Sequence, residues 1–88
     1  MKICYIISYD LEEGQSYDKI IEYIKSFGTW SHITQSTWAV FTDKKASELR
    51  NDLIEFIGNK GRVFVVRSGT EAAWKNTIGT NEWLQKYL

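Results

Sequence analysis

The chain has 88 residues, 43% of them hydrophobic and 15% aromatic, which leaves room for one domain with a single modest core. Eleven basic and eleven acidic residues cancel. The zero net charge argues against a dedicated binder of duplex DNA, because such proteins carry a strongly basic footprint. It leaves open a local basic patch or a small nucleotide ligand.

The first half of the chain predicts a strand, a helix and two further strands. Residues 2–9 are apolar at almost every position, which is typical of a strand buried on both faces. Ser16 is a candidate N-cap for a helix whose apolar side chains recur at helical spacing from Tyr17 to Phe27, and Gly28 is its expected end. Residues 30–34 and 36–41 predict two short strands joined as a hairpin.

The second half predicts a helix, a strand and a terminal helix. Residues 43–47 supply candidate caps for the helix, its apolar stripe runs from Ala46 to Ile57, and Gly58 ends it. Residues 62–67 form the fourth strand, with a continuous apolar centre. Beyond it we expect a helical turn at 71–75, a loop at 76–80 and a terminal helix at 81–88 that buries Trp83, Leu84 and Tyr87.

This order of elements predicts one α+β domain with a ferredoxin-like βαββαβ core over residues 1–68 and a C-terminal helical extension over 69–88. The core is a four-stranded antiparallel sheet with two helices on one face. The first strand is apolar on both sides, so the second sheet face needs a cover. We expect the extension and a second copy of the chain to cover it together, as a symmetric homodimer. Whether the terminal helix packs on its own subunit or on its mate stays open.

The cellular setting follows from what the sequence lacks. No signal peptide or transmembrane span is visible, because the apolar run at 3–9 is too short and has no cleavage site. The single cysteine, Cys4, lies in an apolar strand and cannot form an internal disulfide. We therefore expect a cytosolic protein with no membrane partner.

Two short motifs carry a family resemblance. The first strand ends in Tyr9-Asp10, and Gln35-Ser36-Thr37-Trp38 opens the third strand. Over roughly residues 1–68 the chain resembles the small CRISPR-associated adaptation-subunit family, which includes relatives of virulence-associated protein D. The segments Ala72-Ala73-Trp74 and Glu82-Trp83-Leu84 make it similar to short SinR-like proteins of that superfamily.

The resemblance implies a ferredoxin-like homodimer that is either a metal-dependent nuclease or a nucleic-acid scaffold. The nuclease role would fall on Asp10, and Ser36 would take the polar hairpin position of the family as the second candidate catalytic residue. Members of the family carry basic residues through the first helix and the hairpin. At those places this chain has only Lys19, Lys25 and His32.

Asp10 is the best-placed candidate for chemistry. A carboxylate at the end of a strand can bind Mg²⁺ or Mn²⁺, and such an ion stabilises charge in phosphodiester cleavage. In a two-fold dimer, Asp10 and its mate would share the ion across a cleft. The alternative is that Asp10 only caps the loop that follows it. The lone His32 is a candidate acid or base, but it has no partner for a zinc site.

A second candidate site follows the fourth strand. Arg67, Ser68 and Thr70 offer a guanidinium, hydroxyls and free backbone N–H groups, which together predict a small phosphate cradle. Trp74, Trp30 or Trp38 could stack on a base, with Lys75 on phosphate. The alternatives are a plain connection between elements and tryptophans that belong to the core or the dimer interface.

Three function classes stay open. The first is a homodimeric metal-dependent nuclease, or a degenerate relative of one, with Asp10 as its catalytic residue. The second is a non-catalytic module that binds nucleotides or short nucleic acid through the residues from Arg67 to Lys75. The third is a protein-interaction or toxin–antitoxin-type component without a ligand site. We expect engagement of nucleic acid or a nucleotide by a homodimer.

Overall fold

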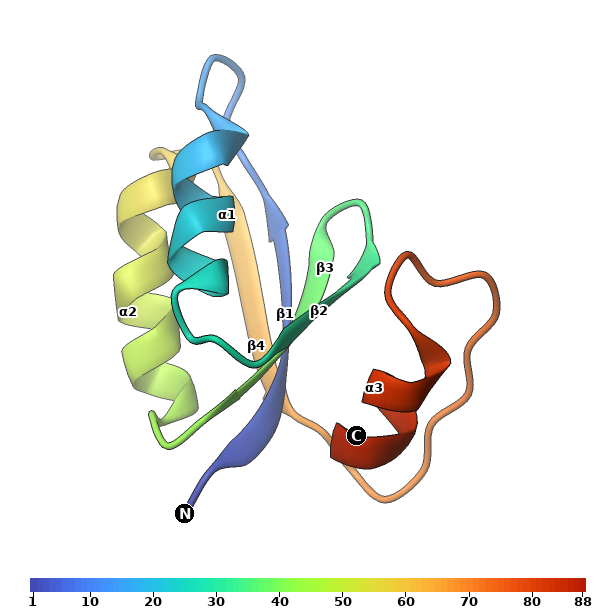
Figure 1. Ribbon diagram of the computed structural model, residues 1–88. Coiled ribbons are helices and arrows are strands. Elements are labelled where there is room, and N and C mark those ends of the chain that lie inside the picture. Colours follow the sequence, from blue (N-terminus) through green and yellow to red (C-terminus); the bar gives the residue numbers. More distant parts are fainter.

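The computed structural model describes residues 1–88 and confirms the predicted ferredoxin-like α+β fold. The strands are β1 (Ile3–Asp10), β2 (Trp30–Thr34), β3 (Thr37–Thr42) and β4 (Arg62–Arg67). They form one sheet in the order β2-β3-β1-β4, in which all neighbours are antiparallel. Helices α1 (Tyr17–Lys25) and α2 (Ala46–Ile57) cover one face of the sheet, and α3 (Asn81–Tyr87) lies against the other (Figure 1).

The core lies between the sheet and helices α1 and α2. Alternate β1 residues Tyr5, Ile7 and Tyr9 point into it, as the alternation of a strand requires. The buried Trp38 of β3 donates its Nε1–H to the Tyr9 hydroxyl over 3.0 Å. Burial raises the pKa of Tyr9, although the hydrogen bond from Trp38 acts in the opposite direction. Ten buried side chains make up this core: Tyr5, Ile7, Tyr9, Ile20, Ile24, Trp38, Val40, Leu49, Leu53 and Ile57.

Local signals set most helix ends. Ser16 is the N-cap of α1, and its Oγ accepts a hydrogen bond from the backbone N–H of Asp18 over 3.2 Å. Gly58 ends α2 with a φ of +82°, a conformation that glycine adopts without strain. Both ends are as predicted. Gly28 also has a positive φ, but it lies in the turn two residues beyond the C-cap of α1, Ser26.

The C-terminal extension packs on its own subunit. After β4 the chain returns across the second sheet face, and α3 covers its lower half in the view of Figure 1. Leu84 is buried, and Tyr87 packs against Phe41 of β3 with ring centroids 4.9 Å apart. Trp83 and Tyr87 are only half-buried. Within a single chain, the terminal helix therefore packs on its own sheet.

The predicted helical turn at residues 71–75 is absent, and only residues 81–87 of the extension are helical. The residues that directly follow this segment bond to the sheet. The N–H groups of Ile78 and Gly79 donate to carbonyl oxygens of β2 at Ile33 and His32, over 3.0 and 2.7 Å. Asn76 has a φ of +56°, which is incompatible with a right-handed helix. The segment therefore runs along the edge of the sheet.

The upper half of the second sheet face has no cover. On edge strand β4, Val63 and Val65 pack towards the helices, but Phe64 and Val66 are 63% and 42% exposed. The expectation that this strand is buried on both faces is therefore not met within one chain. No helix has the length and apolar character needed to cross a membrane; the cytosolic setting stays a prediction.

Candidate functional site

A cavity of about 460 Å³ lies beside the outer edge of β2. We call it the tryptophan cavity. Its walls come from the end of α1, from β2 and β3, from the segment before α3 and from α3 itself. The residues that line it are Lys25, Trp30, Ser31, His32, Trp38, Ile78, Gly79, Thr80 and Trp83. Cavities of this volume are typical of small-molecule sites.

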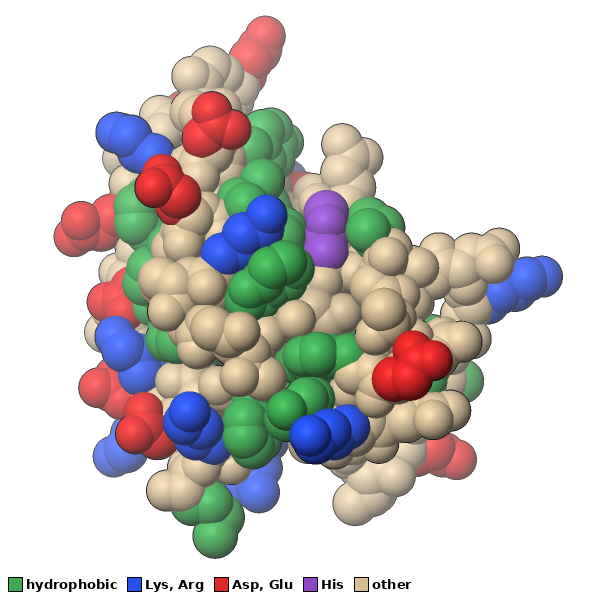
Figure 2. Space-filling view, in the orientation of Figure 1, with side chains coloured by type: hydrophobic (Ala, Val, Ile, Leu, Met, Phe, Trp, Pro, Cys, Tyr) green, Lys and Arg blue, Asp and Glu red, His purple; other side chains and the backbone are tan.

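Aromatic rings and basic groups alternate along one wall of this cavity. The Lys25 ammonium lies 5.0 Å from the centroid of the Trp30 ring, which is a cation–π contact. The His32 ring stacks on Trp38 with centroids 3.9 Å apart. Figure 2 shows the single histidine, in purple, in the middle of this face with basic and hydrophobic side chains beside it. The wall therefore offers flat apolar surface next to positive charge.

The opposite wall depends on a close backbone approach. Gly79 lies against β2, and a Cβ atom added there would collide with the Ser31 hydroxyl and press on the His32 carbonyl. A side chain at this position would require the Ser31 hydroxyl to turn away and the two backbones to move slightly apart. The hydroxyl of Thr80 then caps α3 by accepting a hydrogen bond from the Trp83 N–H over 3.2 Å, which sets Trp83 at the mouth of the cavity.

The side-chain charge that lines the tryptophan cavity is positive only. Lys25 is its one lysine, and no aspartate or glutamate lines it. The His32 Nε2 lies 3.1 Å from the Gln35 carbonyl oxygen, so that nitrogen donates and the imidazole is held in place. The arrangement suits an anionic ligand with a flat ring.

Asp10 lies at the opposite end of the strand from the C-terminal extension, in a hollow of about 220 Å³. Its carboxylate is 3.7 Å from the Arg62 guanidinium, and both side chains are largely exposed. Ser36 is close in the fold, because its carbonyl accepts a hydrogen bond from the Tyr9 N–H over 3.1 Å. Ser8 and Phe64 complete the Asp10 hollow. The structure thus brings the two predicted catalytic residues to one end of the sheet.

The chain offers little for a metal ion at Asp10. No group of three or more histidine, cysteine, aspartate or glutamate side chains is arranged to hold one. Magnesium is often held by one or two carboxylates while waters and substrate phosphates supply the other ligands. Asp10 alone would therefore supply one ligand to Mg²⁺ or Mn²⁺, and waters and substrate phosphates would supply the others.

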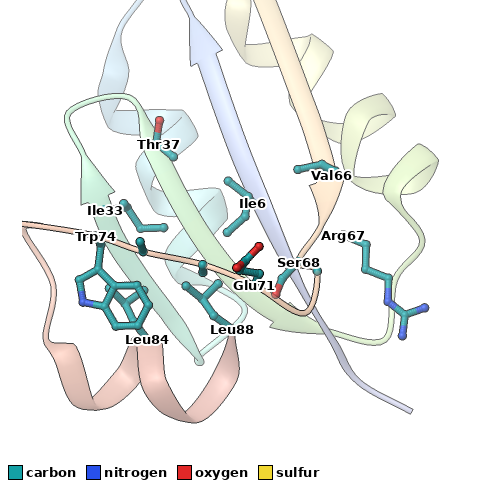
Figure 3. A pocket seen from close by; sticks show the side chains of 13 residues that line it. Ile6, Ile33, Thr37, Val66, Arg67, Ser68, Glu71, Trp74, Leu84 and Leu88 are labelled. Atoms are coloured by element: carbon teal, nitrogen blue, oxygen red, sulfur yellow. The ribbon is translucent and has the colours of Figure 1, made fainter.

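The residues of the predicted phosphate cradle lie where β4 leads into the C-terminal extension, but the Arg67 side chain is turned away from the others. Arg67 pairs with Tyr5 in the sheet, so its side chain is on the helix-covered face. In Figure 3 it points away from the other labelled side chains. Arg67, Ser68 and Trp74 are all among the residues that line a cavity of about 270 Å³ on the second face, which we call the sheet-face cavity. Its walls are mostly apolar, and Arg67 and Glu71 are its two charged lining residues.

The remaining predicted residues lie at the rim of that region or away from it. Thr70 lines a small neighbouring hollow of about 160 Å³ with Trp74. Lys75 is exposed and lines neither cavity. The indole N–H of Trp74 donates to the Asn81 amide oxygen over 3.0 Å, which fixes the ring over the start of α3.

The sequence did not predict that Trp83 lines one cavity together with Lys25, Trp30 and His32. The sequence identified the last three separately, as basic or aromatic residues of the first helix and hairpin. The signal that was missed is Gly79, because a glycine four residues before Trp83 lets the chain approach β2.

No family model matches this chain, and no curated protein or solved structure does either. The resemblance to the CRISPR-associated adaptation subunits therefore stays a prediction from short motifs, and function rests on the geometry of the chain itself.

Proposed function

We propose that this protein is a homodimer that binds a nucleotide or a short single-stranded nucleic acid in the tryptophan cavity. The observation that supports this proposal is the make-up of the cavity. Its volume of about 460 Å³ suits a base with its sugar, and its lining combines tryptophan rings with Lys25 and His32 and lacks carboxylates. Single-stranded nucleic acids are bound by this combination of stacking surface and positive charge.

Each wall has a role in the proposal. The exposed edges of Trp30 and Trp83 supply the surface on which a base stacks, and Lys25 supplies the charge for a phosphate. Lys25 is exposed and is held only by its contact with the Trp30 ring, so it can turn towards an anion. Stacking on such a ring contributes about 1–3 kcal/mol per base, or about 5- to 150-fold in affinity.

The test is a thermal-melting screen of the purified protein against nucleotides, cyclic dinucleotides and short single strands, each with and without Mg²⁺. A ligand at a hundredfold excess over its Kd stabilises the folded state by about 2.7 kcal/mol. Lys25→Ala and Trp83→Ala should each remove most of the shift. Lys19→Ala is the matched control, because Lys19 is exposed on the same helix and does not line the cavity.

Two outcomes would contradict the proposal. One is a shift that survives in Lys25→Ala and Trp83→Ala as fully as in Lys19→Ala. The other is the absence of any shift at millimolar ligand, which would favour the third class, a component that acts through a protein partner. A pull-down from the native host would then identify that partner.

Cleavage of a phosphodiester at Asp10 is a second proposal. It is supported by the Asp10 hollow, where an exposed carboxylate, a guanidinium and an aromatic ring lie together. Arg62 would hold a phosphate and Asp10 would contribute one ligand to Mg²⁺ or Mn²⁺. The Ser36 backbone is close to this end of β1, so the hairpin would form one side of the substrate path.

The cleavage proposal is tested with Asp10→Asn. Metal-dependent cleavage of a labelled single strand should disappear in this variant while its Tm stays the same, since Asp10 is exposed. Glu13→Gln, in the exposed loop beyond β1, is the control. Cleavage that persists in Asp10→Asn would identify a contaminating nuclease and refute the assignment.

A further inference from the structure

The sheet-face cavity is an apolar space between the second face of the sheet and the C-terminal extension. Each of the four strands contributes to its lining, and the extension supplies the rest. Figure 3 shows the aliphatic side chains of Ile6, Ile33 and Val66 on the strands and those of Leu84 and Leu88 on the extension. The volume of about 270 Å³ is just below the range of about 300–1,000 Å³ for drug-sized ligands, so the cavity suits a smaller molecule.

One aromatic ring in this lining is held in place before any ligand arrives. Trp74 is half-buried, and its indole N–H donates to the Asn81 amide oxygen over 3.0 Å. That hydrogen bond uses the edge of the ring and leaves its faces free. Trp74 takes part in no aromatic pair and no cation–π contact within the chain. Among aromatic side chains, the face of an indole attracts an organic cation most strongly.

Glu71 brings an unpaired negative charge to the same cavity. The two ion pairs of the chain lie elsewhere, at α2 and at the far end of β1, and neither involves Glu71. In Figure 3 the Glu71 carboxylate lies among the other labelled side chains, whereas Arg67, the second charged lining residue, points away from them. Ser68 adds a hydroxyl to the lining. A carboxylate only accepts hydrogen bonds and a hydroxyl can accept them, so this end of the cavity suits a donor with positive charge.

We propose that the sheet-face cavity binds a small primary amine with an apolar body, of the arylalkyl or branched alkyl class. The apolar body lies among the aliphatic side chains, and the ammonium lies between the Glu71 carboxylate, the Ser68 hydroxyl and the face of Trp74. The cavity shares no lining residue with the tryptophan cavity or with the Asp10 hollow. The inference therefore does not depend on the proposed function, and it leaves Arg62 and Phe64 open to a substrate.

Ligands of one shape and different charge should bind in a definite order. Phenethylamine is the cation, phenethyl alcohol the neutral analogue, hydrocinnamate the anion and phenylalanine the zwitterion. A partly exposed ion pair and a cation–π contact are each weak, so the amine should bind about 5- to 10-fold more tightly than the alcohol. Hydrocinnamate should bind most weakly, because its carboxylate meets Glu71. Phenylalanine should also bind less tightly than the amine, because the Arg67 side chain that could pair with its carboxylate lies on the other face.

Two-dimensional amide NMR of the isotope-labelled chain, titrated with these four compounds, tests the site and locates it. Phenethylamine should move the indole signal of Trp74 and the backbone signals of Ile6 and Val66 until they saturate. A ligand in the tryptophan cavity would instead move the indole signal of Trp30 most. The same spectra therefore distinguish this site from the proposed nucleotide site, and failure of one leaves the other open to its own test.

Two variants separate the charge from the apolar space. Glu71→Gln should weaken binding of phenethylamine by about 5-fold and leave the affinity for phenethyl alcohol unchanged. Its Tm should stay the same because Glu71 is exposed. Val66→Trp adds bulk at a lining position that is 42% exposed, and it should abolish binding of both compounds. Glu82→Gln is the matched control, because Glu82 is exposed on α3 and lines neither cavity.

Several results would overturn the inference. One is equal affinity of the wild type for the amine and the alcohol, and another is an equal loss in Glu71→Gln and Glu82→Gln. A Trp74 signal that stays fixed at millimolar amine would exclude the site, and tighter binding of hydrocinnamate would make it an anion site. If the Trp74 signal moves with protein concentration and not with the amine, a second copy of the chain occupies the cavity instead.

Discussion

The imidazole of His32 lies flat on the indole of Trp38, with ring centroids 3.9 Å apart and planes inclined by only 9°. Trp38 is buried and hydrogen-bonded to Tyr9, so this stack ties the outermost strand of the sheet to its core. The same imidazole reaches the Gln35 carbonyl in the hairpin turn. One wall of the tryptophan cavity is therefore rigid before any ligand arrives.

The stack and the hydrogen bond of His32 can be separated. His32→Ala removes both and should lower the free energy of unfolding by about 1–2 kcal/mol, whereas His32→Phe keeps a ring on Trp38 and should recover about half of that. Denaturant titration measures both variants, with Thr34→Ala at an exposed position of the same strand as control. Equal losses in both variants would show that stacking contributes nothing.

Gly79→Ala should destabilise the protein by about 1–3 kcal/mol, the usual cost of forcing extra volume into a closed contact. The added methyl group would meet Ser31 and the His32 carbonyl and push the segment away from β2. Gly69→Ala is the matched control, since a Cβ there meets nothing within 4 Å. If thermal melting finds the two variants equally stable, Gly79 is not a close-approach position.

Asp52 should make stability depend on pH in the acid range. The Lys44 ammonium, 2.8 Å away, and the Tyr23 hydroxyl hold the pKa of this carboxyl below its ordinary value. Because the folded pKa is the lower one, this contribution is complete above the unfolded pKa of about 3.9 and is lost as the pH falls through the folded pKa.

The measurement is the difference in unfolding free energy between the wild type and Asp52→Asn, from neutral pH down to about pH 3. The variant should be less stable at neutral pH, and the gap should close on acidification. Glu55→Gln, on an exposed position of the same helix, should show no such trend. A gap that stays constant across the range would contradict the assignment.

Cys4 should be almost unreactive in the folded protein. Burial raises its pKa to about 11 and removes it from solvent, so at neutral pH almost no thiolate is available to attack a disulfide reagent. Reaction with such a reagent should become fast only in denaturant. Ser47→Cys, exposed on α2, is the positive control, and equally fast labelling of Cys4 would show that its strand opens readily.

The βαββαβ core was predictable because its signals are local. Apolar runs, Ser16 at a helix start and Gly58 at a helix end each act within a few residues, and the antiparallel sheet follows from their order. The segment after β4 was harder. The helical turn expected at residues 71–75 is absent, and Ile78 and Gly79 bond to the edge of β2, a contact between residues far apart in the sequence.

The candidate site also depends on contacts between residues far apart in the sequence, which local sequence signals do not reveal. Asp10 and Ser36 were each predicted as a candidate catalytic residue, and both lie at one end of the sheet. Arg67 was expected beside Ser68 and Trp74, but strand alternation turns its side chain to the other face. The tryptophan cavity joins residues from position 25 to position 83, a combination set by tertiary packing alone.

Trp83 and Leu84 are adjacent on α3 and face different spaces, the first the tryptophan cavity and the second the sheet-face cavity. One short helix thus forms part of the wall of the proposed nucleotide site and part of the wall of the sheet-face cavity. A small rotation of α3 would therefore change the shape of both cavities at once. Thermodynamic reciprocity then requires that, if a nucleotide alters the affinity for an amine by some factor, the amine alters nucleotide affinity by the same factor.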